Sequence, residues 1–133
     1  MQERDESAFR VYYEDTDAGG VVQHAAYVRF LERARTEKLR RLGWEQRALA
    51  IKERLLFAGR LSVEYLCPAF LDDMLRVTAV PVKVGASSCI FSQKILCGDK
   101  EAITAEVLVV CVRQNPLRPV KMPAPLASVL KTA

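Results

Sequence analysis

The chain has 133 residues, of which 50% are hydrophobic and 27% are charged, as expected for one globular domain rather than a disordered or fibrous protein. Its 20 basic and 16 acidic residues leave a net charge of +4, a mild excess that suits a phosphate-bearing ligand or an acidic carrier protein. Nucleic-acid binding is not indicated, because no block of lysines and arginines alternates with aromatic residues. No segment approaches the roughly 18 apolar residues of a membrane span.

The first predicted element is a strand over residues 9–14, in which Phe9, Val11 and Tyr13 share one face. Residues 15–20, Asp-Thr-Asp-Ala-Gly-Gly, have the composition of a turn. A long helix is predicted over about residues 24–42, and Gly43 fits a cap at its C-terminus. One side of this helix is charged, and the other carries an apolar stripe. The stripe consists of Tyr27, Phe30, Leu31, Ala34 and Leu42.

Basic residues are concentrated on this predicted helix. They are Arg33, Arg35, Lys38, Arg40 and Arg41. Because Glu32 and Glu37 interrupt the positive charge, we interpret the cluster as a solvated helix face rather than a nucleic-acid site. Trp44 is expected to pack beneath the end of the helix.

A short helix over about residues 45–51 is followed by strands. Leu61, Val63 and Tyr65 share one face of the first strand, and Pro68 is expected to end or bend it. Residues 72–73 form a turn. Over residues 75–84 the alternating apolar residues first stand at odd-numbered positions and then, around Pro81, at even-numbered positions (Val80, Val82 and Val84). This change indicates a bulge or bend.

The remaining strands are predicted over residues 89–97 and 103–112. Residues 85–87 form a turn before them, and Gly98-Asp99 fits the hairpin between them. Residues 103–112 are almost wholly apolar after Glu106, as expected for a strand covered on both faces. The proline-rich tail should be extended and end in a short helix near residues 126–130. One long helix and about five strands joined by short turns predict an α+β fold, with the helix packed on an antiparallel sheet.

The four cysteines are scattered without a CxxC pair, and the chain has a single histidine. A disulfide framework or a zinc site is therefore not expected. We interpret Cys67, Cys89, Cys97 and Cys111 as buried free thiols in a reducing cytoplasm. The opening Met-Gln-Glu-Arg-Asp-Glu has neither the basic start nor the apolar run of a secretory signal.

The segment of residues 12–24 holds the candidate active site. It places acids, a glycine pair and His24 directly before the long helix. Asp17 can act as a base or nucleophile at a carbonyl, glycines let the backbone approach a ligand, and a helix N-terminus stabilises negative charge. The segment is not a calcium loop, because Ala26 stands where that loop needs glutamate. It also lacks dinucleotide, P-loop and G-x-S-x-G motifs.

Each of these candidates has a structural interpretation as well. Asp17 could cap the turn by accepting backbone hydrogen bonds, and Asp15, farther from the helix, suits the role of a structural acid. His24 could cap or pack, and the helix dipole favours its neutral form; its pairing with a nucleophilic cysteine stays open. Tyr13 fits the core or a pocket wall. Glu64 could help a water, or simply occupy an exposed strand position.

Motifs along nearly the whole chain carry a family resemblance. The first is V-Y-Y-E-D-T-D-A-G-G-V-V at residues 11–22, followed by His24, Tyr27 and E-R-A-R-T-E at residues 32–37. Others are V-E-Y at residues 63–65, P-A at 68–69, L-D-D-M-L at 71–75 and A-E-V-L-V-V-C-V at 105–112. These motifs resemble the hotdog-fold acyl-CoA thioesterases of the 4-hydroxybenzoyl-CoA type. Within them they are most similar to the YbgC-like group, which is associated with the bacterial Tol–Pal system.

The resemblance implies a hotdog fold, in which a curved antiparallel sheet wraps a long helix, and assembly into homodimers or homotetramers. It implies an acyl-CoA substrate, with an acyl carrier protein as another candidate, and no metal or cofactor. Asp17 would attack the thioester or activate water, and the helix start near His24 would polarise the carbonyl. The implied substrate-binding residues are Tyr13, Gly19, Gly20, Val22, Gln23, Tyr27 and Glu64. Relatives often have tyrosine at the position of Gln23 and a polar residue at that of Ala26, so these departures bear on the acyl preference.

Two function classes are therefore carried forward. The first is a thioesterase of residues 1–133 that releases a carboxylic acid and free CoA. The second is a non-catalytic module that binds an acyl group or acyl carrier protein, against which the intact Asp17 argues. A hotdog dehydratase would resemble a histidine-centred H-F-P signature, which this sequence lacks, and no residue supports a cell-envelope scaffold.

Overall fold

The computed structural model describes residues 5–133. Residues 1–4, on which the expectation of no secretory signal partly depends, lie outside the described residues. The helices and strands, in chain order, are β1 (Glu6–Arg10), the 3-10 turn η2 (Tyr13–Asp15), α1 (His24–Arg41), α2 (Gln46–Ile51), β2 (Leu55–Tyr65), β3 (Met74–Thr78), β4 (Val80–Val84), β5 (Ser88–Cys97), β6 (Lys100–Arg113), β7 (Arg118–Pro119) and α3 (Ala124–Thr132).

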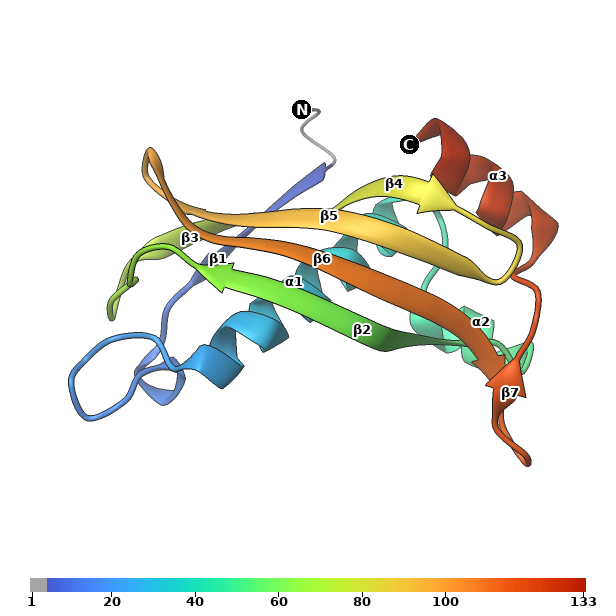
Figure 1. The fold of residues 1–133 in the computed structure, drawn as a ribbon, viewed down its shortest axis with the longest axis horizontal. Helices are drawn as coiled ribbons and strands as arrows, with labels where there is room; N and C mark the ends of the chain where they lie inside the picture. The colour runs from blue at the N-terminus through green and yellow to red at the C-terminus, as the bar shows by residue number, and fades with distance from the viewer. Residues whose placement is uncertain (1–4) are drawn as a thin grey trace.

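The strands form one antiparallel sheet with the order β1-β3-β5-β6-β2. β4 pairs with β5, and the two-residue β7 pairs with β6. The long helix α1 runs across one face of this curved sheet, with the loop before it at one end and α3 beside β4 at the other (Figure 1). The α+β arrangement expected from the sequence is confirmed.

α1 forms because its apolar residues recur at helical spacing and the sheet covers them. Tyr27, Phe30, Leu31 and Ala34 of the predicted stripe are at most 3% exposed. Full burial of a large apolar side chain stabilises a fold by about 1.5–3 kcal/mol, so this stripe fixes the helix on the sheet. The helix ends before Gly43, whose φ of +88° is a backbone conformation that favours glycine. The predicted C-terminal glycine is confirmed, since its N–H donates to the Arg40 carbonyl (3.0 Å).

The expectation of a solvated basic face is wrong for two of its five residues. Lys38 is fully buried and forms an ion pair with the Asp5 carboxylate. Arg35 is 9% exposed, and its Nη1 donates to Gln93 Oε1 (3.0 Å). Arg35 lies four positions after Leu31, and Lys38 lies four positions after Ala34. The helical period therefore places both cations on the buried stripe.

Gln93 connects the helix to two strands from inside the core. Its side chain is 1% exposed, and its Nε2 donates to the Leu31 carbonyl of α1 and the Thr78 carbonyl of β3, both at 3.0 Å. With the bond accepted from Arg35, all of its polar atoms have partners. A buried amide that is fully hydrogen-bonded avoids the cost of a lost hydrogen bond.

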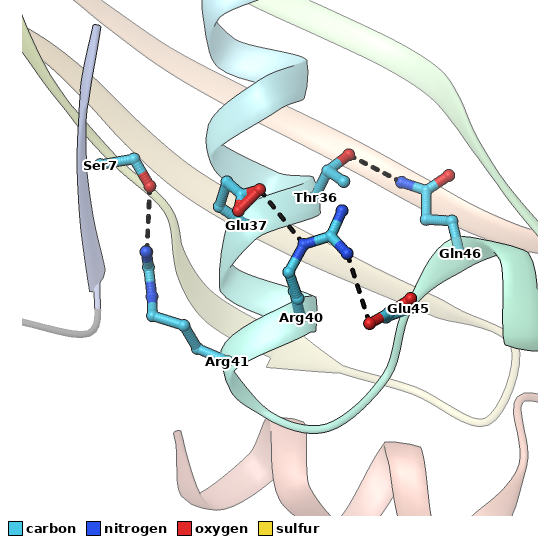
Figure 2. A network of polar contacts seen from close by, with 7 residues as sticks. All are labelled: Ser7, Thr36, Glu37, Arg40, Arg41, Glu45 and Gln46. Atoms are coloured by element: carbon cyan, nitrogen blue, oxygen red, sulfur yellow. Dashed lines mark hydrogen bonds and ion pairs between the residues drawn. The ribbon is translucent and has the colours of Figure 1, made fainter.

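Exposed side chains tie the C-terminal end of α1 to β1 and α2 (Figure 2). The pairs are Arg40–Glu37 (3.2 Å), Arg40–Glu45 (3.4 Å), Arg41–Ser7 (3.0 Å) and Gln46–Thr36 (2.9 Å). Each exposed ion pair stabilises the fold by only about 0–1 kcal/mol. The Arg40–Glu45 and Gln46–Thr36 pairs join α1 to the start of α2. The predicted packing of Trp44 at this end is confirmed.

Two strand boundaries differ from the sequence-based expectation. The first strand ends at Arg10 rather than residue 14, because the chain then turns into η2. Tyr13 is consequently 81% exposed and not part of the core. β2 begins at Leu55, earlier than the alternation around Leu61 indicated.

The expected break near Pro81 is confirmed, since β3 ends at Thr78 and the pairing of β4 with β5 shifts register between Pro81 and Lys83. This shift buries Pro81 and leaves Val82 57% exposed, so the switched apolar phase does not bring Val82 into the core. β6 is covered fully on one face only. Leu108 and Val110, on its other face, are half-buried.

The cysteines are free thiols with different degrees of burial. Cys89 and Cys111 are buried, whereas Cys67 and Cys97 are only half-buried. Burial raises the pKa of the Cys89 thiol to about 12, so this thiol is a packing group rather than a nucleophile at neutral pH. Among the helices of residues 5–133, none combines the length and apolar character needed to cross a bilayer.

Because the Lys38–Asp5 pair is buried, replacing Lys38 by methionine should destabilise the protein far more than the same replacement at an exposed lysine. Lys38→Met leaves the Asp5 carboxylate, whose side chain is 9% exposed, without this cation, and should lower the free energy of unfolding by about 3–5 kcal/mol. Lys94→Met removes an exposed pair with Glu101, whose side chains are 44% and 42% exposed, and should cost less than about 1 kcal/mol. Urea denaturation at one fixed protein concentration measures both. Equal losses would contradict the importance of the buried pair.

Candidate active site

The predicted catalytic Asp17 begins a tight turn just before α1. Its Oδ1 accepts the Gly19 N–H (2.8 Å), its N–H donates to the Val21 carbonyl (2.9 Å), and its carbonyl accepts the Gly20 N–H (3.0 Å). Gly20 has a φ of +80°, which favours glycine at this position. The turn-capping geometry considered for Asp17 is therefore present. Asp17 is nevertheless exposed, and within residues 5–133 its Oδ2 has no partner.

Asp15 holds this loop against the helix. It is buried, its Oδ2 accepts the Tyr12 N–H (2.9 Å), and its Oδ1 lies 3.6 Å from Arg29 Nη2. Its carbonyl also accepts the N–H of Gln23, the residue before α1 (2.9 Å). These contacts are those expected of the structural acid, whereas the Asp17 carboxylate faces solvent.

The N-terminus of α1 is open. Gln23 precedes the helix, but its side chain makes no capping bond, because its Nε2 donates to the Thr16 carbonyl instead (2.7 Å). The first N–H groups of a helix have no partner within it, and the helix dipole gives this end a partial positive charge. The backbone amides of His24 and Ala25 can therefore donate to an oxygen that gains negative charge.

A hollow of about 250 Å³ lies where the start of α1 meets the chain after β2. Its lining residues are Val21, Val22, His24, Tyr27, Tyr65, Leu66, Cys67 and Pro68. The His24 ring lies 4.5 Å from the Tyr65 ring, centroid to centroid, and the Tyr27 ring lies 5.9 Å from it in an edge-on arrangement. The hollow is thus mainly apolar, with the open helix end at its wall.

Tyr27 connects the helix to the chain that closes this hollow. Its hydroxyl accepts the backbone N–H of Ala69 (3.0 Å), a residue that is fully buried. Burial raises the pKa of Tyr27, whereas the Ala69 bond lowers it by a smaller amount. The phenol therefore stays protonated at physiological pH, and its oxygen accepts the Ala69 N–H.

The structure brings together only some of the predicted site residues. Val22, His24 and Tyr27 line the hollow, and Gln23 adjoins it in the chain. Asp17, Gly19 and Gly20 occupy the turn before it. Tyr13 is exposed outside this hollow, and Glu64 lies with Ser62, Ser92, Lys94, Thr104 and Glu106 around a different depression of the sheet.

Five lining residues were not predicted as site residues. They are Val21 before α1, Tyr65 at the end of β2, and Leu66, Cys67 and Pro68 after it. Strand alternation placed Tyr65 on one face with Leu61 and Val63, but sequence alone did not bring it to His24, 41 residues earlier. Cys67 shares the hollow with His24, the pairing left open above. Its Sγ donates instead to the Glu101 carbonyl (3.4 Å), which directs the thiol away from the histidine.

Comparison with known proteins gives consistent results. Residues 11–130 match the model of the Thioesterase-like superfamily. The chain is 47% identical over 124 residues to "Acyl-CoA thioester hydrolase YbgC" of Escherichia coli O6:H1 (strain CFT073), covering 92% of each chain. It is 43% identical over 115 residues to "Acyl-CoA thioesterase YbgC" of Haemophilus influenzae, covering 86% of this chain and 85% of that one.

A solved structure is similar as well. The crystal structure of a probable thioesterase from Bartonella henselae superposes with a TM-score of 0.84 at 30% identity, covering 89% of this chain and 98% of that one. This likeness and the antiparallel sheet around α1 confirm the expected hotdog fold.

The Tyr27–Ala69 hydrogen bond predicts a loss of stability on removal of one oxygen. Tyr27→Phe leaves the buried Ala69 N–H without its acceptor and should lower the free energy of unfolding by about 1–3 kcal/mol. Tyr65→Phe is the matched control, because Tyr65 is 46% exposed and its change should stay within about 0.5 kcal/mol. Thermal or urea unfolding checks both, and a neutral Tyr27→Phe would show that the bond is dispensable.

Proposed function

The chain belongs to the Thioesterase-like superfamily, and from this membership we propose that it hydrolyses acyl-CoA thioesters to a carboxylic acid and free CoA. The observation that carries the proposal is the 47% identity, over 92% of each chain, to a protein named acyl-CoA thioester hydrolase. The turn at Asp17 and the open end of α1 supply groups that this chemistry needs.

The thioester carbonyl is proposed to lie at the N-terminus of α1. Attack on the carbonyl carbon moves negative charge onto the carbonyl oxygen. Amide N–H groups at His24 or Ala25 would donate to that oxyanion, and the helix dipole would add to the effect. One such donor contributes roughly 100- to 1,000-fold in rate. The apolar walls of the hollow, including Val22 and Tyr65, would exclude water from this charge.

Asp17 is proposed to supply the attack, and two routes suit its geometry. As a base, it takes a proton from the water that attacks the carbonyl carbon. As a nucleophile, its oxygen bonds that carbon to form a mixed anhydride, which water then hydrolyses. In both routes the C–S bond breaks and CoA leaves as a thiolate, which takes a proton. Oδ1 is held by Gly19 while Oδ2 is available, which gives an oriented carboxylate for either route.

The remaining predicted residues have positioning roles in this proposal. His24 would act through its backbone amide, and its ring, packed on Tyr65, would form one wall for the acyl group. Gly19 and Gly20 would let the turn approach the thioester closely. Gln23, held on Thr16, would bear on the choice of acyl group, and Tyr13 and Glu64 would need to reach substrate from outside the hollow.

The proposal extends to the assembly and the compartment. Within residues 5–133, β2 is the end strand of the sheet and pairs with β6 alone. It carries Phe57, Leu61 and Tyr65, which are 42%, 39% and 46% exposed. A long edge strand with exposed apolar side chains favours pairing with another chain, so we propose a homodimer or homotetramer.

Free thiols suit a reducing cytoplasm, which we propose as the location of the protein. We also propose that the acyl group of the substrate could be carried by an acyl carrier protein instead of CoA.

The role of Asp17 is tested by Asp17→Asn. The amide oxygen of asparagine can still accept the Gly19 N–H, so the turn should persist while the basic or nucleophilic oxygen is lost. We expect kcat for acyl-CoA hydrolysis to fall about 100- to 10,000-fold. A thiol-release assay with acyl chains from acetyl to palmitoyl, and with benzoyl-CoA, measures this.

Glu14→Gln is the control for this test, since it neutralises an exposed acid three residues earlier in the same loop. It should keep the kcat of the wild-type protein. Retention of activity in Asp17→Asn, or equal losses in both variants, would contradict a chemical role for Asp17. A wild-type protein that binds these thioesters without cleaving any would favour the binding module instead.

Edge pairing through β2 predicts the mass in solution. Light scattering of the wild-type protein should give at least two chains of 14.9 kDa each, because closed homo-oligomers are the common outcome for such a surface. Leu61→Glu places a charge at the edge and should shift the protein toward monomer. Val82→Glu places the same charge on β4, where Val82 is 57% exposed, and should leave the β2 contact intact. A monomeric wild-type protein would overturn this part of the proposal.

A further inference from the structure

Both ends of the loop that carries Asp17 are hydrogen-bonded to one other segment of the chain, residues 69–73. At the end near β1, the N–H of the fully buried Val11 donates to the Asp73 carbonyl (2.9 Å). The Val11 carbonyl accepts the N–H of Asp72 (3.1 Å). Two backbone bonds therefore fix the start of the loop on the C-terminal part of this segment.

The end of the loop near α1 is bound to the N-terminal part of the same segment. The Val22 N–H donates to the Ala69 carbonyl (2.9 Å), and the Gly20 carbonyl accepts the Leu71 N–H (3.4 Å). Val22 is 3% exposed and Ala69 is fully buried, so little solvent competes for the bond between them. The conformation of residues 69–73 thus sets the position of the loop.

The Asp73 carboxylate holds residues 69–73 in shape. Its Oδ2 accepts the Phe70 N–H (2.9 Å), and the Asp73 N–H donates back to the Phe70 carbonyl (3.1 Å), which closes a tight turn. The same Oδ2 accepts a hydrogen bond from the Sγ of Cys97, at the end of β5 (3.4 Å). Hydrogen bonds to an ionised acceptor are roughly twice as strong as those between neutral groups. One carboxylate oxygen therefore closes the turn and ties it to the sheet.

Cys97 remains a donor in this contact at neutral pH. Burial raises the pKa of its thiol, and the hydrogen bond to Asp73 and the charge of Asp73 raise this pKa further. A thiol is a weak donor, so the bond from the Phe70 N–H is the stronger of the two. The turn consequently depends mainly on Asp73, with Cys97 as a second, weaker attachment.

We propose that Asp73 is a positioning residue for Asp17: its carboxylate fixes residues 69–73, and these residues hold the Asp17 loop against the N-terminus of α1. Asp73 would act through the loop and not on the thioester. The kinetic consequence rests on the proposed hydrolysis, since a displacement of about 1 Å can cost about 100-fold in rate. The restraint on the loop does not depend on that reaction and can be measured without a substrate.

Amide hydrogen exchange, followed by NMR, tests the restraint directly. Asp73→Ala removes the carboxylate, and exchange at the Val22 N–H should accelerate at least about tenfold, as expected when a local hydrogen bond is lost. The Trp44 N–H, which donates to the Leu39 carbonyl (2.8 Å) at the other end of α1, should exchange at the wild-type rate. Unchanged exchange at Val22, or equal acceleration at Trp44, would overturn the proposal.

Thiol release from acyl-CoA, at a temperature where every variant is folded, measures the kinetic consequence. In Asp73→Ala, kcat should fall about 100-fold, while KM should stay near the wild-type value. Asp73→Asn keeps an oxygen that can accept from Phe70 and Cys97, so its kcat should fall less than about tenfold. A purely structural role would lower the melting temperature without lowering kcat. Equal kcat in Asp73→Ala and the wild-type protein, or a change in KM alone, would refute the positioning role.

Asp72→Asn is the control for the loss of negative charge at this turn. Asp72 is exposed, and asparagine tolerates its φ of +71°, so exchange at Val22 and kcat should both keep their wild-type values. Effects as large as those of Asp73→Ala would show that charge, and not the Asp73 hydrogen bonds, is responsible.

Cys97→Ala decides the question if Asp73→Ala does not fold. It removes the weaker of the two donors and should accelerate exchange at Val22 and lower kcat, each by a smaller factor than is expected for Asp73→Ala; no change in either would then refute the proposal. A wild-type protein that cleaves no thioester would refute the proposed hydrolysis instead, and the exchange rates alone would decide whether Asp73 restrains the loop.

Discussion

The fold depends on the burial of α1 across the concave face of the sheet, including the polar groups that the helix carries into the core. Eight of its residues are buried, and two of them, Arg35 and Lys38, are cations. Burying a charge is costly unless it is paired and hydrogen-bonded. Asp5 pairs with Lys38, and Gln93 accepts from Arg35 while its amide nitrogen donates to α1 and β3. These contacts fix where the helix lies along the sheet, and so where its N-terminus points.

The position of that N-terminus organises the candidate active site. The buried Asp15 and the Gln23 side chain hold the loop close to the helix without capping it. Asp17 therefore lies in a rigid turn with one free oxygen, while the first amides of α1 stay open. A carboxylate and an electropositive helix end in one loop are the groups that the proposed hydrolysis would use. Tyr65, which lines the hollow, belongs to the exposed edge strand β2, so we connect the site with the proposed assembly.

Two hollows border α1, and they differ in a way that follows from the same packing. At its N-terminal end the helix offers backbone dipoles and aromatic rings, at His24, Tyr27 and Tyr65. Farther along, it offers a buried guanidinium above an apolar floor. Arg35 thus serves the core through its hydrogen bond to Gln93.

Local patterns in the sequence determined much of this protein. Apolar spacing predicted α1, Gly43 predicted its end, the turn residues predicted the Asp17 loop and the Gly98 hairpin, and the motifs predicted the family. These features depend on side-chain period and on hydrogen bonds between near neighbours. The tertiary structure alone decided that Lys38 meets Asp5, that Arg35 meets Gln93, and that Tyr65 meets His24. Those partners lie 33, 58 and 41 residues apart, and they meet because of the order and register of the strands, which no local pattern specifies.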